Sequence, residues 1–166
     1  MISKKICMLG GFSVGKTSLV EQYVHSIFSD KYLSTVGVKI SKKIVSLDGV
    51  DITLMLWDME GKDIYANVNL SYLRGAMGFF SIADGTRKET LETAVALRES
   101  ALNIAGDIPS CLLINKADIR DQWEVTDEEL TALAEKGIHI LHTSARDGTG
   151  VQEAFDYLTR RMIEEQ

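Results

Sequence analysis

Eight residues near the N-terminus constrain this chain more than any other feature. Residues 10–17 read Gly-Gly-Phe-Ser-Val-Gly-Lys-Thr, which matches the pattern G-x-x-x-x-G-K-[ST]. An apolar, strand-like run precedes this pattern, and a segment of helical period follows it. From average residue frequencies, a chance match in a chain of this length has a probability on the order of 1%. We therefore predict a strand, a glycine-rich loop and a helix, in that order.

This arrangement is suited to binding phosphate. Glycines let consecutive N–H groups point at one anion, and the N-terminus of the following helix adds positive potential. Lys16 can bring a mobile charge to β and γ phosphates, and the Thr17 hydroxyl can bind Mg²⁺. A plain glycine-rich turn before a helix is the weaker interpretation, because a strand comes directly before it. The residues predicted to contact a nucleotide here are Ser13, Val14, Gly15, Lys16, Thr17 and Ser18.

The rest of the chain alternates strand-like apolar runs with segments of helical period. Strands are predicted at residues 5–10, 38–47, 51–58, 78–84, 110–115 and 139–143. Helices are predicted at about residues 16–26, 63–74, 89–105, 127–136 and 151–163.

The alternation predicts an α/β fold in one domain over residues 1–166, because no repeat or linker interrupts it. Right-handed crossovers would give a six-stranded, mostly parallel sheet with helices on both faces. Asp48-Gly49-Val50 joins two strands without a helix, so one edge strand should be antiparallel. In such sheets a ligand binds beyond the carboxyl ends of the strands.

A second motif follows the predicted strand at 110–115. In Asn115-Lys116-Ala117-Asp118, the Asp118 carboxylate can accept hydrogen bonds from N1–H and the exocyclic amine of guanine. Adenine presents the wrong pattern, and the unpaired polar groups would cost roughly 10⁴-fold in affinity. Taken alone, the motif is often only a polar turn. Backbone N–H groups of Ser144, Ala145 and Arg146, after the next strand, could reach the base carbonyl, although this segment alone is more simply a loop.

Together these elements resemble the Ras superfamily of small GTPases over essentially the whole chain, which predicts a P-loop NTPase fold of the Ras-like type. Within that group the chain is most similar to Rab proteins. The residues that carry this likeness are Ser34-Thr35-Val36-Gly37-Val38, Leu47-Asp48-Gly49, Leu56-Trp57-Asp58 and Ser71-Tyr72-Leu73-Arg74-Gly75-Ala76.

The resemblance implies further roles. Thr35, together with Thr17, would bind Mg²⁺, and Asp58 would hold the ion through water. The Gly61 N–H would meet the γ phosphate, Phe28 would pack against the guanine edge, and the Lys116 stem would lie along the base. Thr35 could instead be a β-branched residue entering a strand, and Phe28 could simply be core. Spacing from the phosphate loop favours the functional roles.

The chain departs from the family where hydrolysis takes place. The family pattern Asp-x-Ala-Gly-Gln is replaced by Asp58-Met59-Glu60-Gly61-Lys62. A glutamine orients the attacking water, whereas Lys62 carries only donors. With Lys16, Gly61 and Lys62 as the catalytic set, we expect slow unassisted hydrolysis. Glu60 could accept a proton from the water, repel the phosphate, or point to solvent, and Phe12 could either crowd the site or cover it.

The leading hypothesis is a switch that binds GTP or GDP with Mg²⁺ and hydrolyses GTP slowly or with a partner. The alternative is a non-hydrolysing, nucleotide-dependent interaction module. An ATP-using kinase is disfavoured by the segment 115–118. Expected partners are an exchange factor, an activating protein and effectors at the switch regions. Ile64 or Tyr65 should be exposed to them, and Leu73 should be core.

Composition and residue spacing predict further properties of the chain. The net charge of −6 argues against binding to nucleic acid. Cys7 and Cys111 should be buried, reduced thiols rather than a disulfide. Val151, Phe155, Leu158 and Met162 should be core rather than a membrane-binding face, and the three histidines form no cluster. We expect a cytoplasmic monomer without a lipid anchor.

Overall fold

The computed structural model describes residues 2–26, 38–59 and 70–164. The predicted roles of Phe28, Thr35, Glu60, Gly61 and Lys62 lie outside the described residues, as does the expected exposure of Ile64 or Tyr65. The strands are β1 (Ile2–Gly10), β2 (Val38–Leu47), β3 (Val50–Met59), β4 (Gly78–Asp84), β5 (Ser110–Asn115) and β6 (Ile140–Thr143). The α-helices are α1 (Lys16–His25), α2 (Lys88–Ala105), α3 (Asp127–Glu135) and α4 (Val151–Glu164), and 3₁₀ turns form at Leu70–Leu73 and Ala117–Gln122.

The strands form one six-stranded sheet in the order β2-β3-β1-β4-β5-β6. The β2–β3 pair is antiparallel and the other described pairs are parallel. Asp48 (φ 51°) and Gly49 (φ 79°) both have positive φ, as a type I′ hairpin turn requires. The predicted fold, with its antiparallel edge strand, is therefore confirmed.

Two predicted elements differ from the structure by more than one residue at an end. The first strand begins at Ile2 rather than Lys5, because Ile2–Lys5 continue the parallel register with Ile52–Met55 of β3. Of the helix predicted at 63–74, the described part is the 3₁₀ turn Leu70–Leu73 and not an α-helix. Gly75 follows this turn with φ 78°, a left-handed conformation that does not continue a helix.

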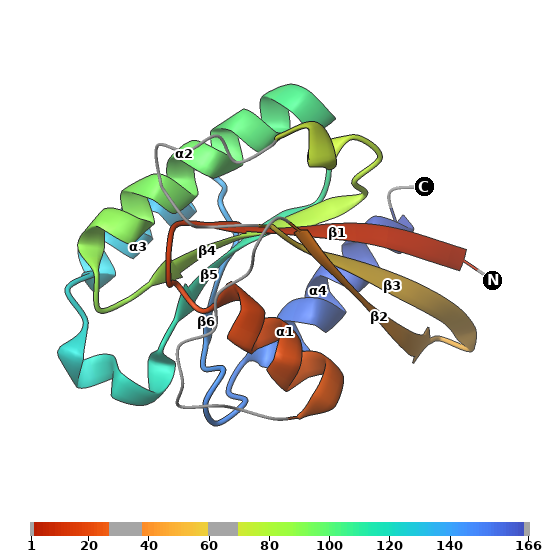
Figure 1. The fold of residues 1–166 in the computed structure, drawn as a ribbon. Coiled ribbons are helices and arrows are strands. Elements are labelled where there is room, and N and C mark those ends of the chain that lie inside the picture. Colours follow the sequence, from red (N-terminus) through yellow and green to blue (C-terminus); the bar gives the residue numbers. More distant parts are fainter. Residues whose placement is uncertain (1, 27–37, 60–69, 165–166) are drawn as a thin grey trace.

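Helices cover both faces of the sheet: α1 and α4 lie on one face, and α2 and α3 on the other (Figure 1). Alternate residues of the central strand β1 serve the two layers, with Ile6 and Met8 on the α1/α4 side and Cys7 and Leu9 on the other. This arrangement leaves the ends of the strands as the edge at which loops can form a site.

The core predictions that fall on described residues are confirmed. Leu73 is buried, and Cys7 and Cys111 are buried free thiols whose pKa values burial raises to about 11 and about 12. Both are therefore protonated at neutral pH. The predicted core residues of α4 are likewise buried: Val151, Phe155, Leu158 and Met162. None of the helices within 2–26, 38–59 and 70–164 is both long and apolar enough to cross a membrane.

Candidate nucleotide-binding site

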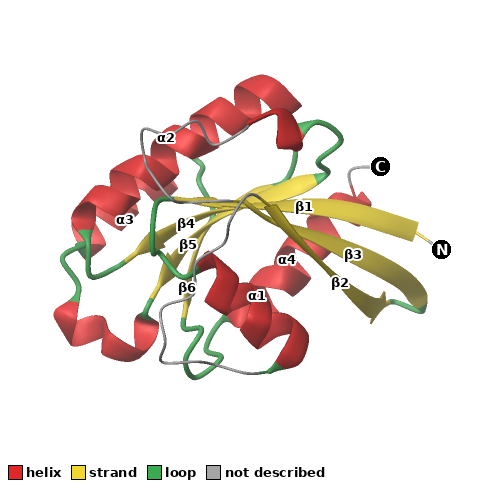
Figure 2. Ribbon diagram, in the orientation of Figure 1, coloured by secondary structure: helices red, strands yellow, loops and turns green. Residues whose placement is uncertain are grey.

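The parallel strands β1, β4, β5 and β6 all have their carboxyl ends at the same edge of the sheet (Figure 2). The loops that follow these strands lead into helices or a 3₁₀ turn. Both sequence motifs, at residues 10–17 and 115–118, begin at the last residue of a strand and continue through the loop that follows it. The predicted position of a ligand, beyond the strand ends, is where the candidate site residues gather.

The loop after β1 is held in a conformation that its glycines permit. Gly15 has φ 100°, and a Cβ there would lie 2.3 Å from Nδ2 of Asn115, so no other residue fits without rearrangement. Ser13 also has a positive φ, of 64°. Val14 is fully buried, while Phe12 is 43% exposed. Ser18 lies half-buried in the first turn of α1.

The ammonium group of Lys16 lies inside the loop. It donates hydrogen bonds to the carbonyl oxygens of Gly10 and Gly11, each at 3.2 Å, and the residue is only 6% exposed. Burial lowers the pKa of Lys16 to about 8, and the nearby charge of Asp58 partly opposes that effect. Lys16 is therefore mostly protonated at neutral pH and poorly solvated, so an anion in the loop would stabilise it.

The Thr17 hydroxyl donates a hydrogen bond to Oδ2 of Asp58 at 2.5 Å. Asp58 is fully buried near the end of β3, and Thr17 is the second residue of α1. A hydroxyl and a carboxylate at this distance are the oxygen donors that Mg²⁺ prefers, so the pair fits the predicted ion. Among the described residues, no group of three or more His, Cys, Asp and Glu could hold a metal by itself.

Asn115, the last residue of β5, links the loop after β1 to the neighbouring strand β6. Its Nδ2 donates to the carbonyl of Val14 at 3.0 Å, and its Oδ1 accepts from the Thr143 hydroxyl at 3.2 Å. The side chain is buried, so both of its polar ends find partners within the protein. Asn115 therefore links the predicted phosphate and base regions.

The two predicted base-recognition segments meet. The Ser144 hydroxyl donates to Oδ1 of Asp118 at 2.9 Å, and the N–H of Asp147 donates to the same hydroxyl oxygen at 3.2 Å. From α1, Nε2 of Gln22 donates to the carbonyl of Ala145 at 3.0 Å. Arg146 is exposed beside them.

Lys116 reaches toward β4. Its Nζ lies 2.8 Å from Oδ2 of Asp84, and its carbonyl accepts a hydrogen bond from Nε1 of Trp123 at 2.8 Å. Burial alone would raise the pKa of Asp84, but hydrogen bonds from Lys116 and Thr86 outweigh it and lower the pKa. The sequence analysis missed Asp84, Arg87 and Trp123. Asp84 could have been found, because it ends a strand next to the phosphate loop.

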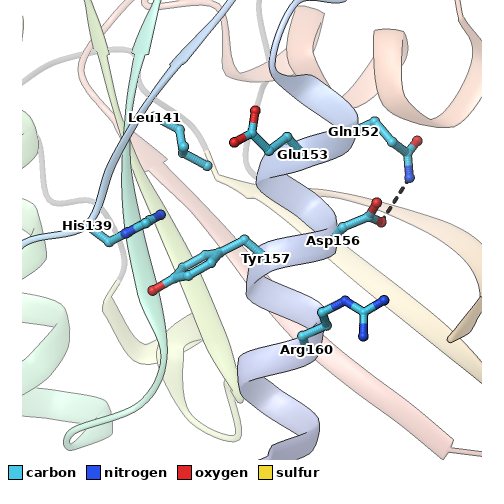
Figure 3. A pocket seen from close by; sticks show the side chains of 7 residues that line it. All are labelled: His139, Leu141, Gln152, Glu153, Asp156, Tyr157 and Arg160. Carbon is cyan, nitrogen blue, oxygen red and sulfur yellow. Dashed lines mark hydrogen bonds between the residues drawn. The ribbon is translucent and has the colours of Figure 1, made fainter. Parts of the chain in front are cut away.

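A separate open pocket of about 620 Å³ lies beside α4 and β6 (Figure 3). The ring of His139 stacks on Tyr157 at 3.9 Å, and Gln152 donates a hydrogen bond to Asp156 at 2.9 Å. None of its lining residues belongs to the predicted nucleotide-binding set. This pocket is therefore not the site that the two motifs predict.

The fold and this edge of the sheet define a P-loop protein of the small GTPase class. The family model described as "Ras family" matches residues 5–164. The chain is 32% identical over 161 residues to "Ras-related protein Rab-8B" from Pongo abelii, covering 96% of this chain and 78% of that protein. It is equally identical to "Ras-related protein Rab-13" from Canis lupus familiaris, covering 96% and 79%. The chain belongs to the Ras family and is a Rab-like small GTPase, as the resemblance predicted.

Proposed function

We propose that this small GTPase switches between GTP and GDP with Mg²⁺ bound, and that it hydrolyses GTP slowly without a partner. The observation that carries the proposal is the pairing of two contacts at one edge of the sheet. Thr17 meets Asp58 at one end, Ser144 meets Asp118 at the other, and Asn115 joins the loops between them. A guanosine phosphate has the two matching ends.

At the phosphate end, Lys16 supplies a desolvated positive charge and the loop supplies N–H groups. Thr17 and Asp58 would hold Mg²⁺, which when bound offsets phosphate charge. At the base end, Ser144 orients the Asp118 carboxylate, which is then left to accept hydrogen bonds from guanine. Lys116, held by Asp84, would lie along the base.

The proposal of slow hydrolysis is supported by two residues of the sequence. Lys62 stands where relatives carry the glutamine that orients water, and Phe12 places an exposed ring in the phosphate loop. The same two residues favour the second candidate, a module that binds GTP and GDP without hydrolysis. The buried Lys16 and the Thr17–Asp58 pair argue against a fully degenerate site and so keep the first candidate ahead.

Partner proteins would dock on the outer face of β2 and β3. Ile40 is 45% exposed and Ile44 is 61% exposed on the edge strand. Ile40 lies opposite Trp57, whose ring is 5.8 Å from that of Tyr72, so apolar side chains from three segments share one face. A contiguous patch of exposed apolar side chains is typical of a surface that binds another protein.

A binding and single-turnover experiment tests the proposal. Purified protein is stripped of nucleotide and reloaded with Mg²⁺ and fluorescent GDP, and unlabelled GDP, GTP, ADP or ATP is then added as competitor. We expect only the guanine nucleotides to compete. Release of γ-phosphate from preloaded GTP then separates the two candidates: slow release supports the switch, and none with or without cell extract supports the module. Equal competition by ATP would refute both.

A further inference from the structure

Arg87 reaches the phosphate loop from the β4–α2 turn. Its Nη2 donates a hydrogen bond to the carbonyl oxygen of Phe12 at 2.8 Å, across 75 positions of sequence. Its Nε donates to Oδ2 of Asp84 at 3.1 Å. The two arms of one guanidinium therefore join a loop carbonyl to a buried carboxylate, a geometry that the fork of arginine allows and a lysine cannot reproduce.

The same carboxylate oxygen holds the base-recognition motif. Oδ2 of Asp84 also accepts from Nζ of Lys116 at 2.8 Å, while Oδ1 accepts from the N–H and hydroxyl of Thr86 at 2.9 Å and 2.7 Å. Asp84 is fully buried. A continuous path of charged hydrogen bonds thus runs from Phe12 through Arg87 and Asp84 to Lys116.

The backbone fixes Arg87 before its side chain makes these contacts. The N–H of Arg87 donates to the carbonyl of Asp84 at 3.0 Å, which closes the turn. The buried Thr90 accepts from the Asp84 N–H at 2.8 Å and donates to the Arg87 carbonyl at 2.7 Å. Because the turn is held in this way, little backbone freedom is lost when the guanidinium binds the loop.

Holding a carbonyl also orients the neighbouring N–H. In a trans peptide the C=O of one residue and the N–H of the next point in opposite directions. The hydrogen bond from Arg87 to the Phe12 carbonyl therefore directs the Ser13 N–H away from Arg87. In the same way, the hydrogen bond from Asn115 to the Val14 carbonyl directs the Gly15 N–H away from Asn115. Both N–H groups belong to the predicted phosphate-binding set.

We propose that Arg87 is a positioning residue that locks the phosphate loop to the Asp84–Lys116 pair and so slows release of the bound nucleotide. This inference rests on the proposed function. Removing Arg87 removes its hydrogen bond to the Phe12 carbonyl and leaves Asp84 with Lys116 as its one remaining charged partner among the described contacts. The hydrogen bond from Asn115 to the Val14 carbonyl still links the phosphate loop to the base motif, but the second link, through Arg87 and Asp84, is lost.

The test measures release of fluorescent GDP, in Mg²⁺ and excess unlabelled GDP, from the unsubstituted protein and three variants. Arg87→Ala removes both arms, and Arg87→Lys keeps a charge for Asp84 but loses the second arm. Arg98→Ala removes the same side chain type elsewhere on α2. We expect release to be about tenfold faster for both Arg87 variants, the effect of losing one charged hydrogen bond, and unchanged for Arg98→Ala.

Other outcomes have defined meanings. Release of both Arg87 variants at the Arg98→Ala rate overturns the inference, as does full recovery in Arg87→Lys, because charge alone would then suffice. A purely structural defect would lower the fraction of protein that loads with GDP, not the release rate of the loaded fraction, and would also overturn it. Failure of the unsubstituted protein to retain guanine nucleotide would instead refute the proposed function.

Discussion

The Thr17 hydroxyl lies 2.5 Å from Oδ2 of Asp58, although the two residues are 41 positions apart. The contact forms because β3 lies beside β1 in parallel register, so the end of β3 comes next to the helix that follows β1. Two oxygen donors of the kind that Mg²⁺ binds are thereby fixed by the sheet itself.

Thr17→Ala should abolish the dependence of GDP retention on Mg²⁺. The substitution removes one of the proposed ion ligands and the hydrogen bond to a buried carboxylate, an interaction worth about 1.5–3 kcal/mol. We expect GDP release in Mg²⁺ to be roughly tenfold faster or more, close to the rate of the unsubstituted protein in EDTA. Thr93→Ala, on the exposed face of α2, is the matched control and should release GDP normally. An intact Mg²⁺ effect in Thr17→Ala would contradict the proposed ion site.

Asp118→Asn should change which base is preferred. The amide replaces one acceptor by a donor, which mismatches the exocyclic amine of guanine and matches the carbonyl that xanthine carries at the same position. Ser144 can still donate to the remaining oxygen. We expect GDP affinity to fall roughly 100-fold or more while affinity for xanthosine diphosphate rises.

Competition binding with the two diphosphates measures this preference. Asp121→Asn, in the same 3₁₀ segment, is the control for charge and should leave the preference for guanine intact. If Asp118→Asn binds GDP as the unsubstituted protein does, the carboxylate does not contact the base.

The sequence predicted the bounds of β4 and β5 because both boundaries are marked locally. Gly78–Asp84 and Ser110–Asn115 are apolar runs that end at polar residues, and the observed bounds match those predicted. The extension of β1 to Ile2 was missed because Ser3 and Lys4 look like a polar terminus, whereas Lys4 is only 4% exposed beside β3.

Contacts between distant loops had no local signal. Nothing in the pattern around Arg87 indicates a bond to Phe12, since that contact depends on how α2 starts relative to the loop after β1. Trp123 is similar: an isolated tryptophan suggests core, yet its Nε1 donates to the Lys116 carbonyl. Both follow from strand order, which the alternation of strands and helices leaves open.

Trp123→Phe should destabilise the loop that carries Lys116. Lys116 has φ 75°, a left-handed conformation that costs a lysine about 1–2 kcal/mol and that the bond from Trp123 helps to hold. Phenylalanine keeps an aromatic ring over Gly85 but removes the donor, so the free energy of unfolding should fall by about 1 kcal/mol. Urea unfolding of the GDP-loaded protein measures the change.

Gly85→Ala tests the packing of the Trp123 ring against Gly85. A Cβ at Gly85 would lie 2.2 Å from the Trp123 ring, so the ring has to move. We expect a larger loss than for Trp123→Phe, about 1–3 kcal/mol, as for other overpacked sites. Gly49→Ala would not be a suitable control because φ there is positive; Ala96→Ser, on the exposed face of α2, should be nearly neutral. Equal stability of Gly85→Ala and the unsubstituted protein would exclude this packing.

The pH dependence of GDP affinity should report Lys16. In the nucleotide-free protein, burial lowers its pKa to about 8 from 10.5, and phosphates in the loop should raise it again. Below pH 8 the lysine is charged in both states, so affinity is unaffected. Above pH 8 binding must take up a proton, so affinity should fall by up to about tenfold per pH unit until the pKa of the bound state is reached.

Because guanine itself titrates at alkaline pH, Lys16→Met is the reference for that measurement. GDP affinity is measured between pH 7 and pH 10 for the unsubstituted protein and for Lys16→Met. The difference between the two pH profiles gives the contribution of Lys16. Parallel profiles would mean that Lys16 does not change protonation on binding, and that its charge does not interact with the phosphates.

Lys62→Gln should accelerate hydrolysis of GTP by the protein alone. The amide of glutamine can accept a hydrogen bond from the attacking water and donate toward the transition state, whereas the ammonium of lysine can only donate. Single-turnover release of γ-phosphate should rise by roughly tenfold, the effect of one well-placed hydrogen bond. Lys42→Gln makes the same chemical change on the exposed face of β2 and should leave the rate unaltered. An unchanged rate for Lys62→Gln would contradict a role for Lys62 in the proposed slow hydrolysis and leave Phe12, whose exposed ring can be tested by Phe12→Gly.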